Sequence, residues 1–228
     1  MTVSFVGSAS AEATSVTLPA HQAGDLILIF AGATGTTSPP SVPAGWRFAA
    51  QSSASGTTPP SFGASVGWKI AASSAETSGT WTGASMVLAV VMRDDTNVLV
   101  IGGIGKATAS SATVNYPVLL LNTGQSVQGM RFTSSYVLLP VMATTNSSDI
   151  DTAPTAQTTT IISRAGTAAI EMAIHRTSAE VASWASTNFT ANATVRYASW
   201  TIEILDTGYA KAAAASFRPV NIRGGADQ

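Results

Sequence analysis

A Gly-x-Ser-x-Gly motif is the strongest catalytic pattern in the sequence. It spans residues 63–67 and matches the nucleophile elbow of serine hydrolases, in which a strand turns sharply into a helix and exposes the serine hydroxyl. His175 with Asp149 or Asp151 would complete the chain order of such a triad. A proline-rich loop precedes Ser65, however, and the residues after it continue as a strand. The context favours a chance match, and a hydrolase is kept only as an alternative.

A glycine-rich stretch at residues 102–107 superficially matches a phosphate-binding loop. A P-loop needs a glycine five residues before the glycine that precedes its lysine, and a hydroxyl directly after the lysine. Val100 and Ala107 occupy these two places. We therefore predict a glycine-rich turn between strands here.

Metal ligation has few candidate residues. His21 and His175 are the two histidines, and neither has a ligand partner at i+2 or i+4. Asn146, Asp149 and Asp151 supply oxygen atoms within one loop, but they lack the EF-hand spacing for calcium. Solvated turn residues are the favoured interpretation, and no metal site is predicted.

Glycosidase chemistry would require two carboxylates that face one cleft. No spacing singles out a pair among the dispersed candidate glutamates, which are Glu76, Glu171, Glu180 and Glu203. We therefore predict no catalytic residues and no cofactor, and we expect that the chain is not an enzyme.

Five tryptophans have two possible roles. They could stack on sugar rings, or they could anchor the core of a β-sandwich, because a large aromatic side chain buries much apolar area. Most of them lie within apolar strand patterns, which favours the core. They are Trp46, Trp68, Trp81, Trp184 and Trp200.

The composition is poor in charge. Charged residues make up 10% of the 228 residues, against about 25% in ordinary soluble domains, and the mean hydropathy is +0.26. A surface of roughly 9,700 Å² is expected at this size. Because it carries so few charged side chains, few ions lose their hydration when this surface is buried against identical neighbours. The composition therefore favours a homo-oligomer, for which we prefer a trimer.

Several partners and locations are excluded by the same composition. A net charge of −1 without clustered Lys or Arg argues against nucleic acid. The longest apolar runs, residues 26–31 and 86–92, are too short for a membrane helix. The first residues lack a signal-peptide pattern, so we expect synthesis in a cytoplasm. Without cysteine, stability must come from packing and assembly.

Short apolar runs between clusters of Gly, Pro, Ser, Thr and Asn predict an all-β, antiparallel, jelly-roll-like sandwich. A change of phase along the last strand predicts a bulge near Ser199. We assign residues 1–205 to the sandwich and 206–228 to an extended C-terminal arm. The expected strands are 3–6, 15–18, 25–33, 46–51, 64–71, 85–93, 136–144, 158–163, 169–176 and 194–205.

The chain also contains a faint internal echo. Glu76 precedes Trp81 as Glu180 precedes Trp184, and each segment leads to an Ala-Ser pair. The offset is about half the chain, as a duplicated half-sandwich would produce.

Part of the sequence resembles a recurrent bacteriophage virion protein pattern. The resemblance rests on "AGDLILIF" at residues 23–30, "PAGW" at 43–46, "GWKIA" at 67–71 and the segment from Glu76 to Trp81. It implies a jelly-roll or related β-sandwich displayed on a capsid or tail, commonly as a homotrimer, with no catalytic residues. The chain has no repetitive shaft, which favours a compact capsid decoration (cement) protein; a tail-associated carbohydrate-binding adhesin is the alternative.

The C-terminal arm supplies the expected partner-binding residues. It offers apolar anchors and guanidinium donors to a neighbouring subunit, either another copy or a major capsid or tail protein. These residues are Phe217, Arg218, Val220, Ile222 and Arg223. We expect the protein to be located in the virion.

Overall fold

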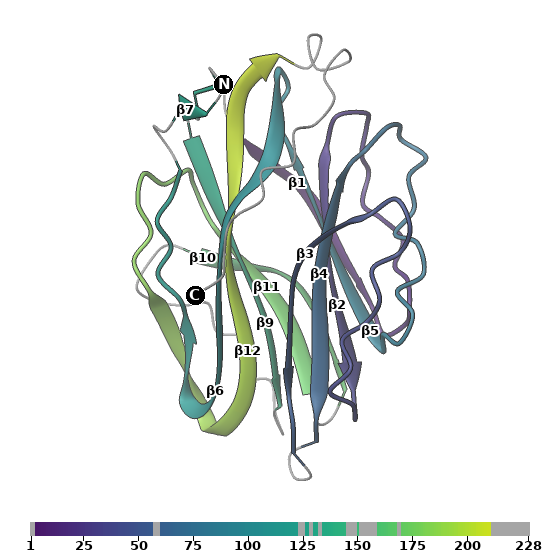
Figure 1. Ribbon diagram of the computed structural model, residues 1–228, viewed down its shortest axis with the longest axis vertical. Coiled ribbons are helices and arrows are strands. Elements are labelled where there is room, and N and C mark those ends of the chain that lie inside the picture. Colours follow the sequence, from purple (N-terminus) through teal and green to yellow (C-terminus); the bar gives the residue numbers. More distant parts are fainter. Residues whose placement is uncertain are drawn as a thin grey trace.

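The computed structural model describes residues 3–56, 60–122, 126–127, 130–131, 134–144, 150, 159–167 and 170–210. Two five-stranded antiparallel sheets pack face to face, which confirms the expected β-sandwich (Figure 1). The first half of the chain builds sheet A, whose strands are β1 (Ser4–Ala11), β2 (Leu26–Thr34), β3 (Arg47–Ala54), β4 (Phe62–Ile70) and β5 (Met86–Arg93).

The second half of the chain builds sheet B and a small separate hairpin. The hairpin consists of β7 (Ser126–Val127) and β8 (Met130–Arg131). The strands of sheet B are β6 (Asn97–Tyr116), β9 (Ser134–Thr144), β10 (Thr159–Thr167), β11 (Ile170–Thr177) and β12 (Thr187–Ala210). Each sheet is thus completed by one continuous half of the chain.

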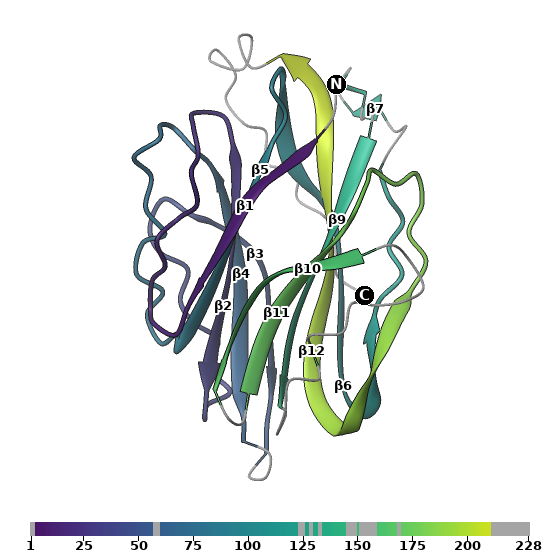
Figure 2. The same cartoon turned by 180° about the vertical axis from the view of Figure 1, so that it is seen from behind.

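The two sheets have the same winding. Sheet A has the order β1-β5-β2-β4-β3, and sheet B has the order β6-β12-β9-β11-β10. If β7 and β8 are set aside, each sheet therefore follows the order first, fifth, second, fourth, third. Edge strand β1 packs near β10 (Figure 2). The equivalent strands of the other half, β6 and β3, also pack near each other. The two halves of the chain therefore share one strand order and make corresponding edge contacts.

The internal echo coincides with this repeat. The Glu76 to Trp81 segment joins β4 to β5, and the Glu180 to Trp184 segment joins the equivalent strands β11 and β12. The Ala-Ser pairs do not match: Ala84-Ser85 precedes β5, whereas Ala198-Ser199 lies inside β12.

The central strands of both sheets are covered on both faces. The central core lies between them, where Phe30 of β2 meets Trp200 of β12 with ring centroids 5.0 Å apart. Outside sheet A, Val16 and Trp81 cover a second apolar layer that includes Ile29. Burial on both faces explains why β2 and β5 are continuous apolar runs, because neither of their faces meets water.

The outer face of sheet B is covered by its own longest strands. Beyond β9, the ends of β6 and β12 continue as a two-stranded ribbon that bends back over the sheet (Figure 1). The hydroxyl of Ser199 on the sheet donates to the carbonyl of Asn115 on the ribbon. The bend coincides with a register shift between Thr190 and Val195.

Three expectations about local structure were wrong. The phase change at Ser199 needs no bulge: β12 stays in register with β6 from Val195 to Ile202, and the next shift lies between Ile202 and Ile204. Tyr197 faces the apolar cluster outside sheet B (the outer core) and Trp200 faces the central core, because β12 is buried on both faces. Residues 15–18 form no strand and instead cross the outer face of sheet A. Residues 102–107 lie inside β6 and form no turn.

The remaining expected strands are present with shifted ends. Strand β12 extends to Ala210, past the boundary expected after residue 205. The rest of the expected arm, residues 211–228, lies outside the described residues.

Candidate functional site

Ser65 is a structural residue of β4. Its side chain lies opposite Ala31 on the outer face of sheet A, beneath the loop that contains Pro40. The hydroxyl is buried and donates to the Pro40 carbonyl at 2.6 Å. His175 lies in the outer core of sheet B, beside Tyr116. The whole sandwich therefore separates Ser65 from the histidine that the hydrolase interpretation needs, while Asp149 and Asp151 lie outside the described residues.

The glycines of β6 make room for residues 117–122, the crossing segment, which follows β6 and runs over the outer face of sheet B. A Cβ atom on Gly103 would lie 3.0 Å from Leu119, and one on Gly105 would lie 2.9 Å from Pro117. A Cβ atom on Gly102 would lie 2.3 Å from the carboxylate of Glu203. These close approaches, and not a bound phosphate, account for the glycines.

Glu203 is a buried polar anchor. Its Oε1 accepts hydrogen bonds from the Asn122 backbone N–H at 2.6 Å and from the Ser135 hydroxyl at 2.9 Å. Its Oε2 accepts from the Gly103 backbone N–H at 2.9 Å and from the Asn122 side chain at 2.8 Å. Four donors thus hold this carboxylate and fasten the end of the crossing segment to β6, β9 and β12.

The other glutamates also have structural contacts. Lys69 pairs with Glu76, and this hydrogen bond lowers the pKa of Glu76 below its ordinary value, assisted by the backbone N–H of Ala72. Glu180 accepts from the backbone N–H of Val3 at 3.1 Å. Glu171 is buried on β11. None of these contacts forms a pair of carboxylates that faces a cleft.

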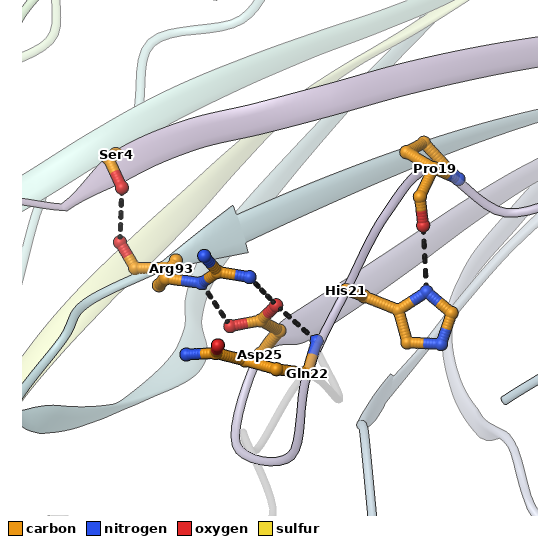
Figure 3. Close-up of polar contacts among 6 residues, drawn as sticks. All are labelled: Ser4, Pro19, His21, Gln22, Asp25 and Arg93. Carbon is orange, nitrogen blue, oxygen red and sulfur yellow. Dashed lines mark hydrogen bonds and ion pairs between the residues drawn. The ribbon is translucent and has the colours of Figure 1, made fainter. Parts of the chain in front are cut away.

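Asp25 and Arg93 form a buried ion pair at one end of sheet A (Figure 3). Arg93 donates from Nε to Oδ1 at 2.8 Å and from Nη2 to Oδ2 at 2.7 Å, and the Gln22 N–H also donates to Oδ2 at 2.9 Å. Asp25 is fully buried, whereas Arg93 is partly exposed. This contact raises the pKa of Arg93 above its ordinary value. The pair ties the start of β2 to the end of β5.

The residues that carry the phage resemblance therefore build the fold. Gly24, with φ of 87°, turns the chain so that Asp25 reaches Arg93. Gly45, with φ of 82°, lies in a turn closed by the Trp46 N–H donating to the Pro43 carbonyl at 3.2 Å. The ion-paired partner Arg93 was not predicted from sequence, because it lies 68 residues from Asp25.

The tryptophans do not form an open platform in the described structure. Trp81, Trp184 and Trp200 are buried, as the core interpretation predicts. Trp46 and Trp68 are half-buried, and each has a cation over its ring. Lys69 lies 5.4 Å from the ring centroid of Trp46, and Arg47 lies 5.0 Å from that of Trp68.

No group of three or more His, Cys, Asp or Glu side chains that could hold a metal occurs within the described ranges. His21 Nδ1–H donates to the Pro19 carbonyl at 2.7 Å, so this ring forms a hydrogen bond within its own loop (Figure 3). The calcium candidates Asn146, Asp149 and Asp151 lie outside the described residues.

The most distinctive surface feature is apolar. Among described residues, the exposed large apolar side chains are Phe48, Val118 and Leu120, and Leu120 is 90% exposed. Sequence reasoning singled out none of these three residues, although a signal for Val118 and Leu120 was available. No charged residue occurs between Lys106 and Arg131, and an apolar run, residues 117–121, lies within that stretch.

The fold and these contacts define an antiparallel β-sandwich whose described polar groups mainly hold its own strands and loops together. Comparison with protein-family models, with curated proteins and with solved structures finds no match for this chain. No helix in the described part of the chain is long and apolar enough to cross a membrane. The expected partner-binding residues of the arm lie outside the described ranges; they are Phe217, Arg218, Val220, Ile222 and Arg223.

Proposed function

We propose that this chain is a virion structural protein, a capsid decoration (cement) subunit that binds and stabilises neighbouring virion proteins. It works by shape and assembly, and it requires no cofactor. The bacteriophage assignment rests on the sequence resemblance at residues 23–30, 43–46 and 67–71. In this proposal the protein is made in the host cytoplasm and becomes part of the particle.

The observation that carries the assembly role is the low density of surface charge. The chain has 11 basic and 12 acidic residues for an accessible surface of 10206 Å². Five of the acidic residues are buried, which leaves at most 18 charged side chains for that surface. The buried ones are Asp25, Asp94, Glu171, Glu203 and Asp206. A neutral, polar surface of this kind desolvates few ions on assembly, so contact with identical subunits carries a small electrostatic cost.

The carbohydrate-binding alternative gains no support from the described residues. An adhesin of this class would present open aromatic faces beside polar loop groups. The half-buried Trp46 and Trp68 instead pack against Lys69 and Arg47. The structural role therefore accounts better for the tryptophans.

We expect the purified protein to form a symmetric oligomer, with a trimer of about 69 kDa, three times the chain mass of 23.1 kDa. Size-exclusion chromatography with light scattering measures this mass directly. A monomer at micromolar concentration that also fails to bind particles would contradict the assembly role.

Deletion of residues 211–228 should leave the sandwich folded, because strand β12 ends at Ala210 and stays complete. Particle binding should weaken, because the deletion removes the proposed anchors Phe217, Val220 and Ile222 and the donors Arg218 and Arg223. Circular dichroism melting follows the fold, and cosedimentation with particles that lack the protein follows binding.

Cryo-electron microscopy of the reconstituted particles locates the full-length chain. Density for the sandwich on the capsid exterior is the expected result. If the truncated protein unfolds in isolation, residues 211–228 belong to the fold of their own chain and do not serve as an arm.

A further inference from the structure

Each half of the chain sends a segment across the outer face of its own sheet, directly after its first strand. In the first half, residues 12–20 follow β1; in the second half, residues 117–122 follow β6. Each segment contacts the loop that precedes the last strand of its own half, which contains Trp81 in the first half and Trp184 in the second. The backbone N–H of Trp81 donates to the Thr14 carbonyl at 2.8 Å, and Leu119 forms an isolated bridge with Trp184. The two crossing segments are thus structural equivalents.

The inward side chains of both crossing segments are apolar. Val16 and Leu18 pack on the outer layers of sheet A, and Leu119 and Leu121 pack on the outer core of sheet B. Burial of these side chains fixes each segment in an extended conformation with alternate residues pointing away from the sheet.

The outward side chains differ between the halves. In the first half they are Ser15 and Thr17, both exposed and polar, as expected for a surface in water. In the second half they are Val118, which is 62% exposed, and Leu120, which is 90% exposed. The same architectural position is therefore polar in one half and apolar in the other, which indicates that a partner covers the second.

The second crossing segment is held firmly before any partner arrives. The carbonyl of Pro117 accepts from Trp184 Nε1 at 3.2 Å and from the Thr201 hydroxyl at 2.8 Å. At the other end, Asn122 is bound to Glu203 through both its backbone and its side chain. A segment fixed at both ends loses little conformational freedom when its exposed side chains are buried.

The charge pattern favours a second copy of the chain as the partner. No charged residue occurs between Lys106 and Arg131, so Val118 and Leu120, the apolar strip, have no charged neighbour within ten residues along the sequence. When two copies bring this strip together at a symmetry axis, Leu120 meets Leu120 and no like charges from this stretch oppose each other. A charged partner would find no complementary side chain in this stretch.

We propose that Val118 and Leu120 form the self-association surface of this protein, where each copy packs against the same residues of a neighbouring copy around the oligomer axis. The inference rests on the proposed homo-oligomer and assigns its contact surface. It is independent of the phage assignment.

The test replaces Val118 and Leu120 with the residues of the equivalent segment. The double variant Val118→Ser, Leu120→Thr should retain the wild-type far-ultraviolet circular dichroism spectrum, because both side chains are exposed on the single chain and lie outside its core. Its melting temperature should fall only by the part that self-association contributes. Its self-association should weaken at least ~100-fold, which converts the light-scattering mass at micromolar concentration to that of a monomer. Leu120→Glu, which places like charges together at the axis, should have the same effect.

Phe48→Ser is the matched control, because Phe48 is 57% exposed but lies on β3 of the other sheet. This variant should keep the wild-type mass. If the wild type is an oligomer and both Leu120 variants keep its mass, the surface assignment is wrong while the assembly role stands. A monomeric wild type would instead remove the proposed self-association.

Discussion

Replacing Arg93 with alanine should lower the free energy of unfolding by about 3–5 kcal/mol, because it leaves a buried carboxylate without its counterion. Asp25 is fully buried, and two of the three hydrogen bonds to its carboxylate come from the guanidinium of Arg93. The remaining donor, the backbone N–H of Gln22, cannot neutralise the charge. Urea unfolding of the wild type and the variant, followed by tryptophan fluorescence, measures the difference.

The double variant Asp25→Asn, Arg93→Ala should recover part of this loss, because it removes the uncompensated charge. Arg47→Ala is the matched control. Arg47 is exposed and stacks over Trp68, so its removal should cost at most about 1 kcal/mol. Equal losses for Arg93→Ala and Arg47→Ala would show that the buried pair has no special role in stability.

The stability of the protein should also fall between pH 6.5 and pH 4, because His175 is buried as a neutral ring. Burial lowers the pKa of His175 to about 4, and the backbone of Ile150 offsets part of this effect. The ring packs against Tyr116 and Phe189, and neither of its nitrogens has a well-formed hydrogen bond.

The sign of this pH dependence follows from which state of the protein binds the proton. Between the unfolded-state pKa near 6.5 and the folded-state value near 4, the unfolded chain binds a proton that the folded chain does not. The contribution of the neutral His175 ring to the free energy of unfolding is therefore fully present above about pH 7, and it is lost as the pH falls through this window. The full loss is about 3 kcal/mol, at about 1.4 kcal/mol for each pH unit.

His175→Leu tests this expectation, because leucine fills the site and cannot be protonated. Urea midpoints at pH 7 and pH 4.5 should differ less in this variant than in the wild type, whereas His21→Gln should retain the wild-type difference. If His175→Leu loses as much stability as the wild type between these two pH values, another group is responsible for the acid sensitivity.

Local sequence patterns were sufficient for the fold class. Runs such as residues 86–92, which are short, rich in valine and bounded by turn residues, are typical of buried strands. The central strands were therefore predicted close to their observed limits. The sequence also predicted that the Gly-x-Ser-x-Gly match around Ser65 lies in a strand and not in a strand-to-helix turn, as β4 confirms.

Strand β6 was not predicted, because its middle is rich in Gly, Ala, Ser and Thr and shows no apolar period. Its glycines are required by the proximity of Leu119, Pro117 and Glu203, contacts that exist only after the chain has crossed back over the sheet. Local propensity contains no information about such an approach.

The sequence by itself determined the class of the protein: an antiparallel β-sandwich without disulfides and with few charges. These properties depend on composition and on neighbours a few residues apart. Tertiary structure alone decided which apolar residues are covered. Leu119 and Leu120 are adjacent and chemically identical, yet one packs on the outer core and the other is 90% exposed. The difference arises because alternate side chains of an extended segment point in opposite directions, and only the position of the sheet determines which direction is buried.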